Sequence, residues 1–212
     1  MTRGKFITFE GGEGTGKSTQ SGILTQRLTD AGLRVLPTRE PGGSHGAEAL
    51  RKLLVEGRED RWSPLAEALL MYAAREDHLK QRIRPALNDG TWVVCDRFAD
   101  STRAYQGAAG GVPADFIAEL ERTVVGDDRP DLTLVFDLPV EIGLERAMGR
   151  DMFETRFESK GLAFHQRLRD AFRAIAEADP ERCVLIDAAA SMDAVTDQVW
   201  RAVQDRLGGH GL

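Results

Sequence analysis

Apolar residues gather in five short runs along the chain, and longer stretches with apolar residues at helical spacing separate these runs. The short runs are rich in β-branched and aromatic residues. Runs such as "WVVC" and "LTLVF" are apolar on both faces, which is typical of parallel strands covered by helices on both sides. The pattern predicts strands at Lys5–Glu10, Arg34–Thr38, Thr91–Asp96, Leu132–Asp137 and Cys183–Asp187.

The longer stretches between these runs carry the periodicity of amphipathic helices. They predict helices near Lys17–Ala31, Gly46–Leu54, Pro64–Asn88, Pro113–Val125, Glu141–Ala147, Glu158–Ala178 and Asp193–Leu207. Alternating strands and helices favour a doubly wound α/β sandwich with right-handed crossovers. The chain has no internal repeat, low-complexity segment or long linker, so residues 1–212 are expected to form a single domain.

Composition supports this class, because 42% of the 212 residues are hydrophobic and 29% are charged, as in an ordinary globular protein. The longest apolar runs are shorter than the roughly 18–20 residues that a membrane span needs. No apolar signal region precedes the first predicted strand, so we expect a cytoplasmic protein with no membrane partner. The net charge of −6 argues against a nucleic-acid partner.

The cysteines and histidines indicate neither a disulfide nor a metal centre. Cys95 and Cys183 each lie in a predicted buried strand and are expected to be free thiols. The four histidines are unclustered and lack metal-ligand spacing, so we expect structural or exposed side chains at His45, His78, His165 and His210.

The stretch "GGEGTGKS", residues 11–18, matches the pattern G-x-x-x-x-G-K-[ST] between a predicted strand and a predicted helix. Glycines allow the backbone to curl round an oxyanion with its N–H groups inward, and the helix adds its positive N-terminal end. Lys17 is expected to reach the outer phosphates, and Ser18 is expected to ligate Mg²⁺. The sequence thus predicts a nucleoside triphosphate site formed by Gly11, Gly12, Glu13, Gly14, Thr15, Gly16, Lys17, Ser18 and Thr19.

A phosphate-binding loop does not distinguish GTPases, motor ATPases and small-molecule kinases. A GTPase needs an Asn-Lys-x-Asp segment, and the single asparagine, Asn88, is followed by Asp89. A motor or recombination ATPase remains an alternative, although 212 residues leave little room for its additional elements. Three arginines favour a second anionic ligand, because Arg39 and Arg97 follow predicted strands whose carboxyl ends should meet, and Arg75 lies in a predicted helix.

The chain resembles bacterial thymidylate kinases, which transfer the γ-phosphoryl group of ATP to dTMP. The resemblance rests on "FEGGEGTGKST", "TREPGG", "YAAR", "GTWVVCDRFADSTRAYQG", "RPDLTLVFDLP" and an arginine-rich stretch ending in "TRFE", in the family's order between residues 9 and 158. It implies a three-layer α/β sandwich with a five-stranded parallel sheet, the P-loop NTP hydrolase-like fold, with a mobile lid at about residues 147–160. It also implies ATP and Mg²⁺ as cofactors, dTMP as acceptor, and a homodimer packed through helices. The apolar faces of Ala47–Leu54 and Leu65–Tyr72 are candidates for that contact, and burial inside the monomer is the equally good alternative for them.

The resemblance implies roles for residues near the transferred phosphoryl group. Glu13 is expected near the 3′-hydroxyl of dTMP, and Arg97 is expected to hold the acceptor phosphate against the γ-phosphoryl group. Asp96 would orient the metal or its waters, and Arg39 is expected on the acceptor side.

The base and sugar pocket follows in the same way from the resemblance. Arg75 is expected to donate to the thymine carbonyl, and Ser101, Thr102 and Tyr105 are expected to line the pocket, with Tyr105 under the deoxyribose where a 2′-hydroxyl would crowd it. Met71 departs from the family pattern, because it stands where a phenylalanine usually stacks on thymine. A thioether can still contact the ring face, with less rigidity.

Further positive charge is needed at the transferred group, and Thr15 in the loop has none to offer. The stretch "ERAMGRDMFETRFESKG" is the candidate lid, with Arg150 as the first catalytic candidate and Arg156 as the second. Arg146 is expected on the preceding helix, and a solvated charged hairpin is the alternative interpretation of this stretch. With Lys17 and Arg97, these arginines would suffice for direct in-line transfer without a covalent intermediate.

Two other functions remain open from the sequence. The first is a kinase of the same fold with a different acceptor, such as dUMP or a deoxynucleoside. The second is a regulator that holds ATP without turnover, which would release no ADP with any nucleotide acceptor.

Overall fold

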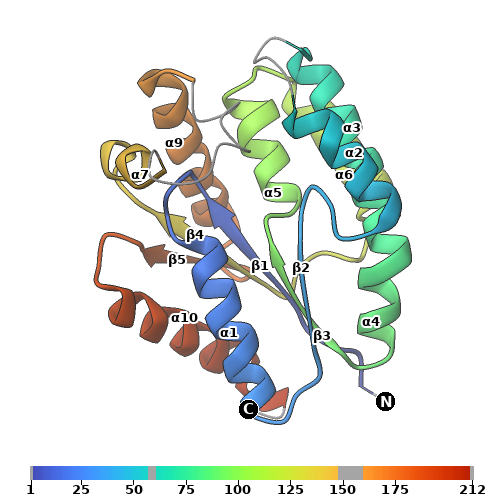
Figure 1. Ribbon diagram of the computed structural model, residues 1–212, viewed down its shortest axis with the longest axis vertical. Coiled ribbons are helices and arrows are strands. Elements are labelled where there is room, and N and C mark those ends of the chain that lie inside the picture. Colours follow the sequence, from blue (N-terminus) through green and yellow to red (C-terminus); the bar gives the residue numbers. More distant parts are fainter. Residues whose placement is uncertain (1, 57–60, 148–159, 211–212) are drawn as a thin grey trace.

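The protein is described here by a computed structural model, which covers residues 2–56, 61–147 and 160–210. Five parallel strands form one sheet in the order β2-β3-β1-β4-β5 (Figure 1). They are β1 (Phe6–Gly11), β2 (Val35–Arg39), β3 (Trp92–Asp96), β4 (Leu132–Asp137) and β5 (Cys183–Asp187). The predicted five-stranded parallel sheet is confirmed, and each strand lies within one residue of its expected bounds.

Helical segments connect the strands. Those of the described chain are α1 (Lys17–Asp30), α2 (His45–Val55), α3 (Pro64–His78), η1 (Leu79–Ile83), α4 (Arg84–Asn88), α5 (Ala99–Thr102), η2 (Arg103–Ala108), α6 (Ala114–Val124), α7 (Val140–Ala147), α9 (Leu162–Ala178), α10 (Met192–Leu207) and the short 3₁₀ turn η3 (Gly208–His210).

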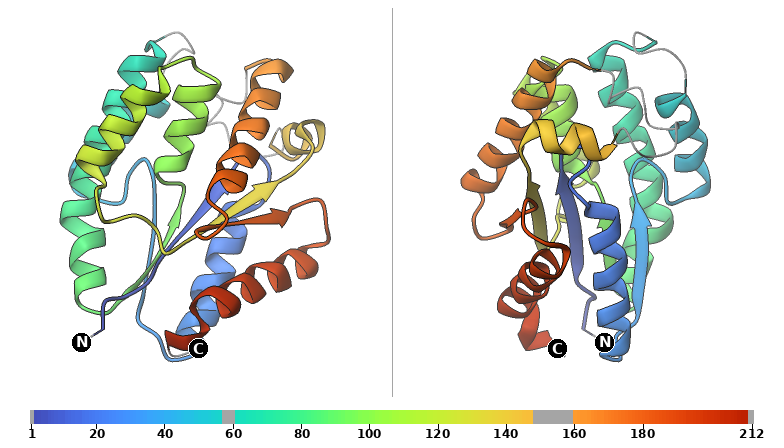
Figure 2. Two further views of the ribbon diagram at one scale, coloured as in Figure 1. Left: turned by 180° about the vertical axis from the view of Figure 1, so that it is seen from behind. Right: turned by 60° about the vertical axis from the view of Figure 1, so that its left-hand side comes forward.

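The sheet is covered on both faces, which explains why its central strands β1 and β4 are buried along almost their whole length and are largely apolar. Helices α1 and α10 cover one face, where Leu24 and Leu28 of α1 pack with Val199 and Val203 of α10 against β1 and β4 (Figures 1 and 2). The helices α3, α4, α6 and α9, with the segment α5–η2, contribute the buried residues of the other face. The result is the expected three-layer sandwich.

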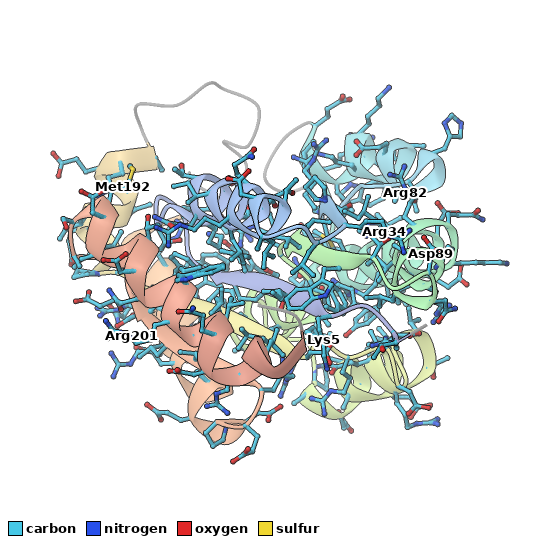
Figure 3. The ribbon with its side chains drawn as sticks, turned by 90° about the horizontal axis from the view of Figure 1, so that it is seen from below. Lys5, Arg34, Arg82, Asp89, Met192 and Arg201 are labelled. Atoms are coloured by element: carbon cyan, nitrogen blue, oxygen red, sulfur yellow. The ribbon has the colours of Figure 1, made fainter. Side chains whose placement is uncertain are left out.

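Parallel strands carry their carboxyl ends to one edge of the sheet, and this edge holds the loops after β1, β2 and β3. Figure 3 looks onto the opposite edge, where Lys5 lies before β1 and where Arg34 and Asp89 form an ion pair. In an open α/β sheet the ligand site is expected at the carboxyl edge, beside the central strand β1.

Two helical segments differ from the prediction. The single helix expected over Pro64–Asn88 contains a π-helical turn at Leu79–Ile83. Pro85 lies in the first turn of the following α4, and since proline has no N–H and crowds the preceding turn, a wider π turn accommodates it. The sequence prediction also missed the helical segment Ala99–Ala108, formed by α5 and η2 directly after β3.

Both cysteines are buried free thiols, as expected. Across the described ranges, no helix combines the length and the apolar character that crossing a membrane requires.

Candidate active site

The loop between β1 and α1 has the geometry of a phosphate cradle. Gly11, Gly14 and Gly16 have φ angles of 135°, 67° and 88°, which other residues rarely adopt. A Cβ atom at Gly14 would lie 2.0 Å from the carbonyl oxygen of Gly143, so the loop can approach α7 this closely only with glycine there. No side chain caps the N-terminus of α1, which leaves its first N–H groups to a ligand.

Lys17, the first residue of α1, folds back over the loop. Its Nζ atom donates to the carbonyl oxygen of Gly12 at 2.5 Å and to Thr15 Oγ1 at 3.1 Å. The side chain is buried, and burial together with the nearby charge of Arg97 lowers the pKa of Lys17 to about 8. Thr19 is exposed in the same first turn. The protonation of the Lys17 amine in this loop therefore depends on the charged groups beside it.

The two predicted metal ligands lie together. Ser18 Oγ donates to Asp96 Oδ2 at 2.5 Å, although the residues come from α1 and from the end of β3. Asp96 Oδ1 is buried, and no partner for it occurs among the described residues.

This pair of oxygen ligands fits Mg²⁺, which binds hydroxyl and carboxylate oxygens and completes its shell with waters and substrate phosphates. No group of three or more His, Cys, Asp or Glu side chains suited to a metal occurs in the described ranges. A cage made only of protein ligands is therefore not what these residues offer.

A second cavity lies beside the loop, between the ends of β2 and β3 and the helices α2, α3 and α5–η2. Most of the predicted substrate-binding residues line it. The full lining is Glu13, Glu40, Pro41, Arg51, Val55, Met71, Arg75, Arg97, Phe98, Ser101, Thr102, Tyr105 and Gln106. The structure thus brings together residues that are separated by more than ninety positions in the sequence.

Arg97 joins the cavity to the phosphate loop. Its Nη1 atom donates to the carbonyl oxygen of Gly11 at 3.0 Å, and its Nη2 atom donates to Glu13 Oε1 at 3.0 Å. Arg97 has a φ of 67° and is the one non-glycine residue with a positive φ in the described chain. A left-handed backbone at a non-glycine residue costs roughly 1–2 kcal/mol, so surrounding contacts must hold the backbone of Arg97 in this conformation.

Glu13 is held by the residues that face it. Tyr105 donates to Glu13 Oε1 at 2.5 Å, and the Arg97 guanidinium lies over the Tyr105 ring, 5.1 Å from its centroid. Burial favours a neutral Glu13, but the charges of Arg97 and Lys17 and the Tyr105 hydrogen bond outweigh it and hold the pKa of Glu13 below its ordinary value. Glu13 is therefore a carboxylate at the border between the phosphate loop and the second cavity.

Arg75 is almost fully buried at the floor of the second cavity. Its Nε atom donates to Glu40 Oε2 at 2.8 Å, and its Nη2 atom donates to the Phe98 carbonyl at 2.9 Å and to Thr102 Oγ1 at 3.2 Å. The remaining nitrogen, Nη1, is buried and has no partner among the residues that the structure describes. An unpaired buried donor in a cavity wall suits a ligand acceptor such as a carbonyl oxygen.

Arg39 corrects the expectation that three predicted arginines share one cleft. Its side chain is 56% exposed, pairs with Glu48 at 3.2 Å and is not part of the cavity lining. Successive side chains of a strand point in opposite directions, and at the end of β2 it is Glu40 that turns inward. The third guanidinium in the lining belongs to Arg51 of α2, which donates to the Pro41 carbonyl at 2.7 Å.

Three charged residues at or beside this site escaped the sequence prediction: Glu10, Glu40 and Arg51. Arg51 lies on the helix that directly follows the glycine-rich turn "EPGG", and this position of a basic residue was the signal available for it. The two carboxylates stand at the ends of predicted strands, but their partners are distant in the sequence: Arg75 for Glu40, and Phe98 and Ser101 for Glu10.

Glu10 is the most buried of these carboxylates, with an exposed fraction of 0%. It accepts from the backbone N–H groups of Phe98 and Ser101 and from the Ser101 hydroxyl. Burial, and then the charge of Asp100, raise the pKa of Glu10 to about 7 against the opposing effect of its hydrogen bonds.

The remaining predicted residues divide into two groups. Met71, Ser101, Thr102 and Tyr105 all line the second cavity. The lid candidates Arg150 and Arg156, and almost all of the expected lid at 147–160, lie outside the described residues.

Comparison with known proteins gives a consistent result. The family model described as thymidylate kinase matches residues 9–199. A thymidylate kinase of Caulobacter vibrioides is 61% identical over 208 residues, which cover 98% of this chain and 100% of that protein. One of Nitrobacter winogradskyi is 55% identical over 206 residues, covering 96% of this chain and 90% of that one. The crystal structure of thymidylate kinase from Ehrlichia chaffeensis superposes with a TM-score of 0.77 at 34% identity, covering 95% of this chain and 99% of the other.

Proposed function

The chain belongs to the thymidylate kinase family, whose members phosphorylate dTMP to dTDP with ATP, and we propose that it performs this transfer between the phosphate loop and the adjoining cavity. The observation that carries the assignment of the two sites is the position of Arg97. Its guanidinium donates to the loop at Gly11, pairs with Glu13 and lines the second cavity. A phosphate bound on either side would lie within reach of the same cation.

On the donor side, we propose that the phosphates of ATP bind the N–H groups of the loop and of the first turn of α1. Lys17 would exchange its contacts with Gly12 and Thr15 for the outer phosphates. Ser18 and Asp96 would hold Mg²⁺, which would neutralise part of the phosphate charge there.

In the transfer itself, an oxygen of the dTMP phosphate forms a bond to the γ-phosphorus of ATP, and the bond from that phosphorus to the bridging oxygen of ADP breaks. The transition state is loose, and its charge spreads over the transferred oxygens. Lys17 and Arg97 offset this charge from fixed positions, which is the protein's main contribution. A phosphate oxygen is already nucleophilic, so Glu13 and Asp96 are not needed as strong bases.

On the acceptor side, we propose that Arg97 and Arg51 bind the dTMP phosphate and that Arg75 Nη1 donates to a carbonyl oxygen of thymine. The buried, unpartnered state of that nitrogen within the described chain supports the second assignment. Met71 would contact the face of the base, and Tyr105 would pack under the deoxyribose. Arg39 was expected on the acceptor side, and that role stays a prediction. The ion pair of Arg39 with Glu48 does not support it.

We also propose that Arg150, or Arg156 in its place, closes over the triphosphate from the segment 147–160, and that the enzyme acts in the cytoplasm. The two free buried thiols suit a reducing compartment.

A homodimer is a further part of the proposal. Leu53 of α2 and Leu65 and Leu69 of α3 are 39%, 47% and 48% exposed on neighbouring helices, which is a large apolar surface for a monomer to leave in water. Sedimentation equilibrium would show a dimer for the wild type and a shift toward monomer for Leu69→Lys. A wild type that sediments as a monomer at micromolar concentration would contradict this part.

Coupled detection of ADP tests the function directly. We expect rapid ADP formation with dTMP, slower turnover with dUMP, which lacks the 5-methyl group, and none with thymidine, which has no phosphate for Arg97 to bind. The Arg97→Ala variant is expected to lose at least a hundredfold in kcat, the scale of removing one charge-stabilising donor. Turnover of thymidine faster than of dTMP, or none with any acceptor, would contradict the assignment.

A further inference from the structure

Glu10 ends β1 beside the phosphate loop, yet the transfer described above assigns it no role. The carboxylate is completely buried, and three donors converge on it. Its Oε1 atom accepts from Phe98 N at 2.8 Å and from Ser101 N at 3.2 Å, and its Oε2 atom accepts from Ser101 Oγ at 2.6 Å. A buried charge is costly unless hydrogen bonds satisfy it, and these bonds all come from one segment, the turn that follows Arg97.

The hydrogen bond between Ser101 and Glu10 determines the direction in which the Ser101 hydroxyl donates. A serine hydroxyl has a single hydrogen to donate, and here the donation goes to Glu10. The lone pairs of the oxygen are then left for other donors. One such donor is Arg97 Nη1, which lies 3.4 Å from Ser101 Oγ. Glu10 therefore fixes the direction of a chain of hydrogen bonds that runs from Arg97 through Ser101.

The backbone contacts act on the same segment. Phe98 is the N-cap of α5 and provides no side-chain cap, so the carboxylate of Glu10 satisfies N–H groups at this helix start. Arg97 stands immediately before it in the left-handed region of the backbone. The amide of Arg97 donates to the Phe9 carbonyl at 2.9 Å, so the neighbour of Glu10 on β1 holds the other side of the strained residue.

We propose that Glu10 is a positioning residue for phosphoryl transfer, which, as an acceptor-only carboxylate, holds the turn after Arg97 and directs a lone pair of Ser101 toward the Arg97 guanidinium. The inference rests on the proposed function, in which Arg97 contacts the acceptor phosphate. Glu10 itself touches neither nucleotide.

The substitution Glu10→Gln separates shape from polarity, because glutamine has the same outline but carries one oxygen and one NH₂ group. With its oxygen toward the two backbone N–H groups, the NH₂ group faces Ser101, whose hydroxyl must then turn its hydrogen away from residue 10 and accept from the amide instead of donating to it. With the amide reversed, the NH₂ group faces the two N–H groups. The reversed amide places donors against each other, and the first orientation removes the acceptor that fixes the Ser101 hydroxyl. In both cases the position of Arg97 is expected to suffer.

The test is a double-mutant cycle of Glu10→Gln and Ser101→Ala, measured at pH 8 so that Glu10 is mostly ionised. We expect Glu10→Gln to lower kcat/KM for dTMP at least tenfold while the Kd for ATP stays within threefold of wild type. Ser101→Ala is expected to lower kcat/KM as well. The double variant is expected to be no worse than Glu10→Gln alone, because both changes interrupt one chain of contacts.

Asp131→Asn is the matched control. Asp131 Oδ2 accepts from Phe6 N at 2.8 Å and its Oδ1 accepts from Lys5 Nζ at 3.0 Å. This carboxylate therefore also binds the start of β1, at the opposite edge of the sheet, where Figure 3 labels Lys5. Its kcat/KM for dTMP is expected to stay within threefold of wild type.

Three results would overturn the positioning role: a Glu10→Gln kcat/KM within threefold of wild type, effects that multiply in the double variant, or an equal loss in Asp131→Asn. If Glu10→Gln does not fold by circular dichroism, Ser101→Thr and Ser101→Ala decide the question. Threonine keeps the hydroxyl that Glu10 accepts and is expected to be at least threefold more active than alanine, which is expected to lose at least tenfold. Equal activity of these two variants would also overturn the role. Wild-type protein that forms no dTDP would contradict the proposed function itself, and the positioning role with it.

Discussion

Lys17 should take up a proton when ATP binds. In the free protein, burial and the charge of Arg97 lower the pKa of Lys17 to about 8, so at pH 8 about half of the molecules have a neutral lysine. Phosphate oxygens beside the amine favour its charged form and raise this pKa again. Binding at pH 8 is then coupled to protonation, and the affinity for ATP should fall as the pH rises through and above 8.

The magnitude follows from linkage. A pKa that moves from about 8 to above 10 gives an uptake of about 0.5 proton per ATP at pH 8 and about 0.1 at pH 7. At about pH 9 the uptake approaches one proton, and the Kd for ATP then rises by close to tenfold per pH unit. Isothermal titration calorimetry in buffers with different ionisation enthalpies measures the uptake directly, as the slope of the observed enthalpy against the buffer enthalpy.

Lys17→Arg is the control, because arginine remains charged at pH 8. Glu10, whose pKa is raised to about 7, contributes equally in both proteins, so the difference between them isolates Lys17. An uptake near zero for wild type at pH 8, or an equal uptake in Lys17→Arg, would refute the argument that burial and Arg97 discharge this lysine.

Further substitutions test the other parts of the site. Arg75→Met should lower the free energy of urea unfolding by about 3–5 kcal/mol, because it leaves Glu40 buried without its guanidinium. Arg39→Met breaks an exposed pair and should lower it by about 0–1 kcal/mol. Equal losses in the two variants would contradict the burial argument. Met71→Phe should tighten dTMP binding by about 0.5–1.5 kcal/mol in calorimetry through ring stacking, and weaker binding would argue against contact with the base. Arg150→Ala should lower kcat at least tenfold in steady-state assays, and a smaller loss would count against the lid role.

The fold could be predicted from the sequence wherever local pattern and tertiary environment agree. The central strand β4 is largely apolar on both faces and was predicted with its observed bounds, Leu132–Asp137, and the bounds of the edge strand β5, Cys183–Asp187, were also predicted. The helical segment Ala99–Ala108 was missed because "ADSTRAYQGA" has no helical apolar period. Its start depends on Glu10, which is distant in the sequence and satisfies the backbone N–H groups of Phe98 and Ser101.

The candidate site could be predicted to the extent that its residues lie in local motifs. The glycines of the loop, Lys17 and Ser18 follow from spacing, and Arg75 and Arg97 follow from resemblance. The structure places the first group in the phosphate loop and the start of α1, and the two arginines in the adjoining cavity. The direction of a side chain at the end of a strand could not be predicted. A shift of one residue exchanges the two faces of a strand, and Arg39 points outward for this reason while Glu40 points in.

The carboxylates of the site explain how a protein of net charge −6 can keep several cations in one buried place. A guanidinium without a partner would pay a large desolvation cost, and each buried arginine here has a carboxylate: Glu40 for Arg75 and Glu13 for Arg97. These pairs reduce the net attraction for phosphate but fix the donors before any ligand arrives. An incoming phosphate must therefore share Arg97 with Glu13 in an already determined geometry, and a ligand of the wrong shape gains little from the charge. Selectivity in this site should thus come from preorganisation more than from electrostatic attraction, which is why its acidic residues matter as much as the arginines they hold.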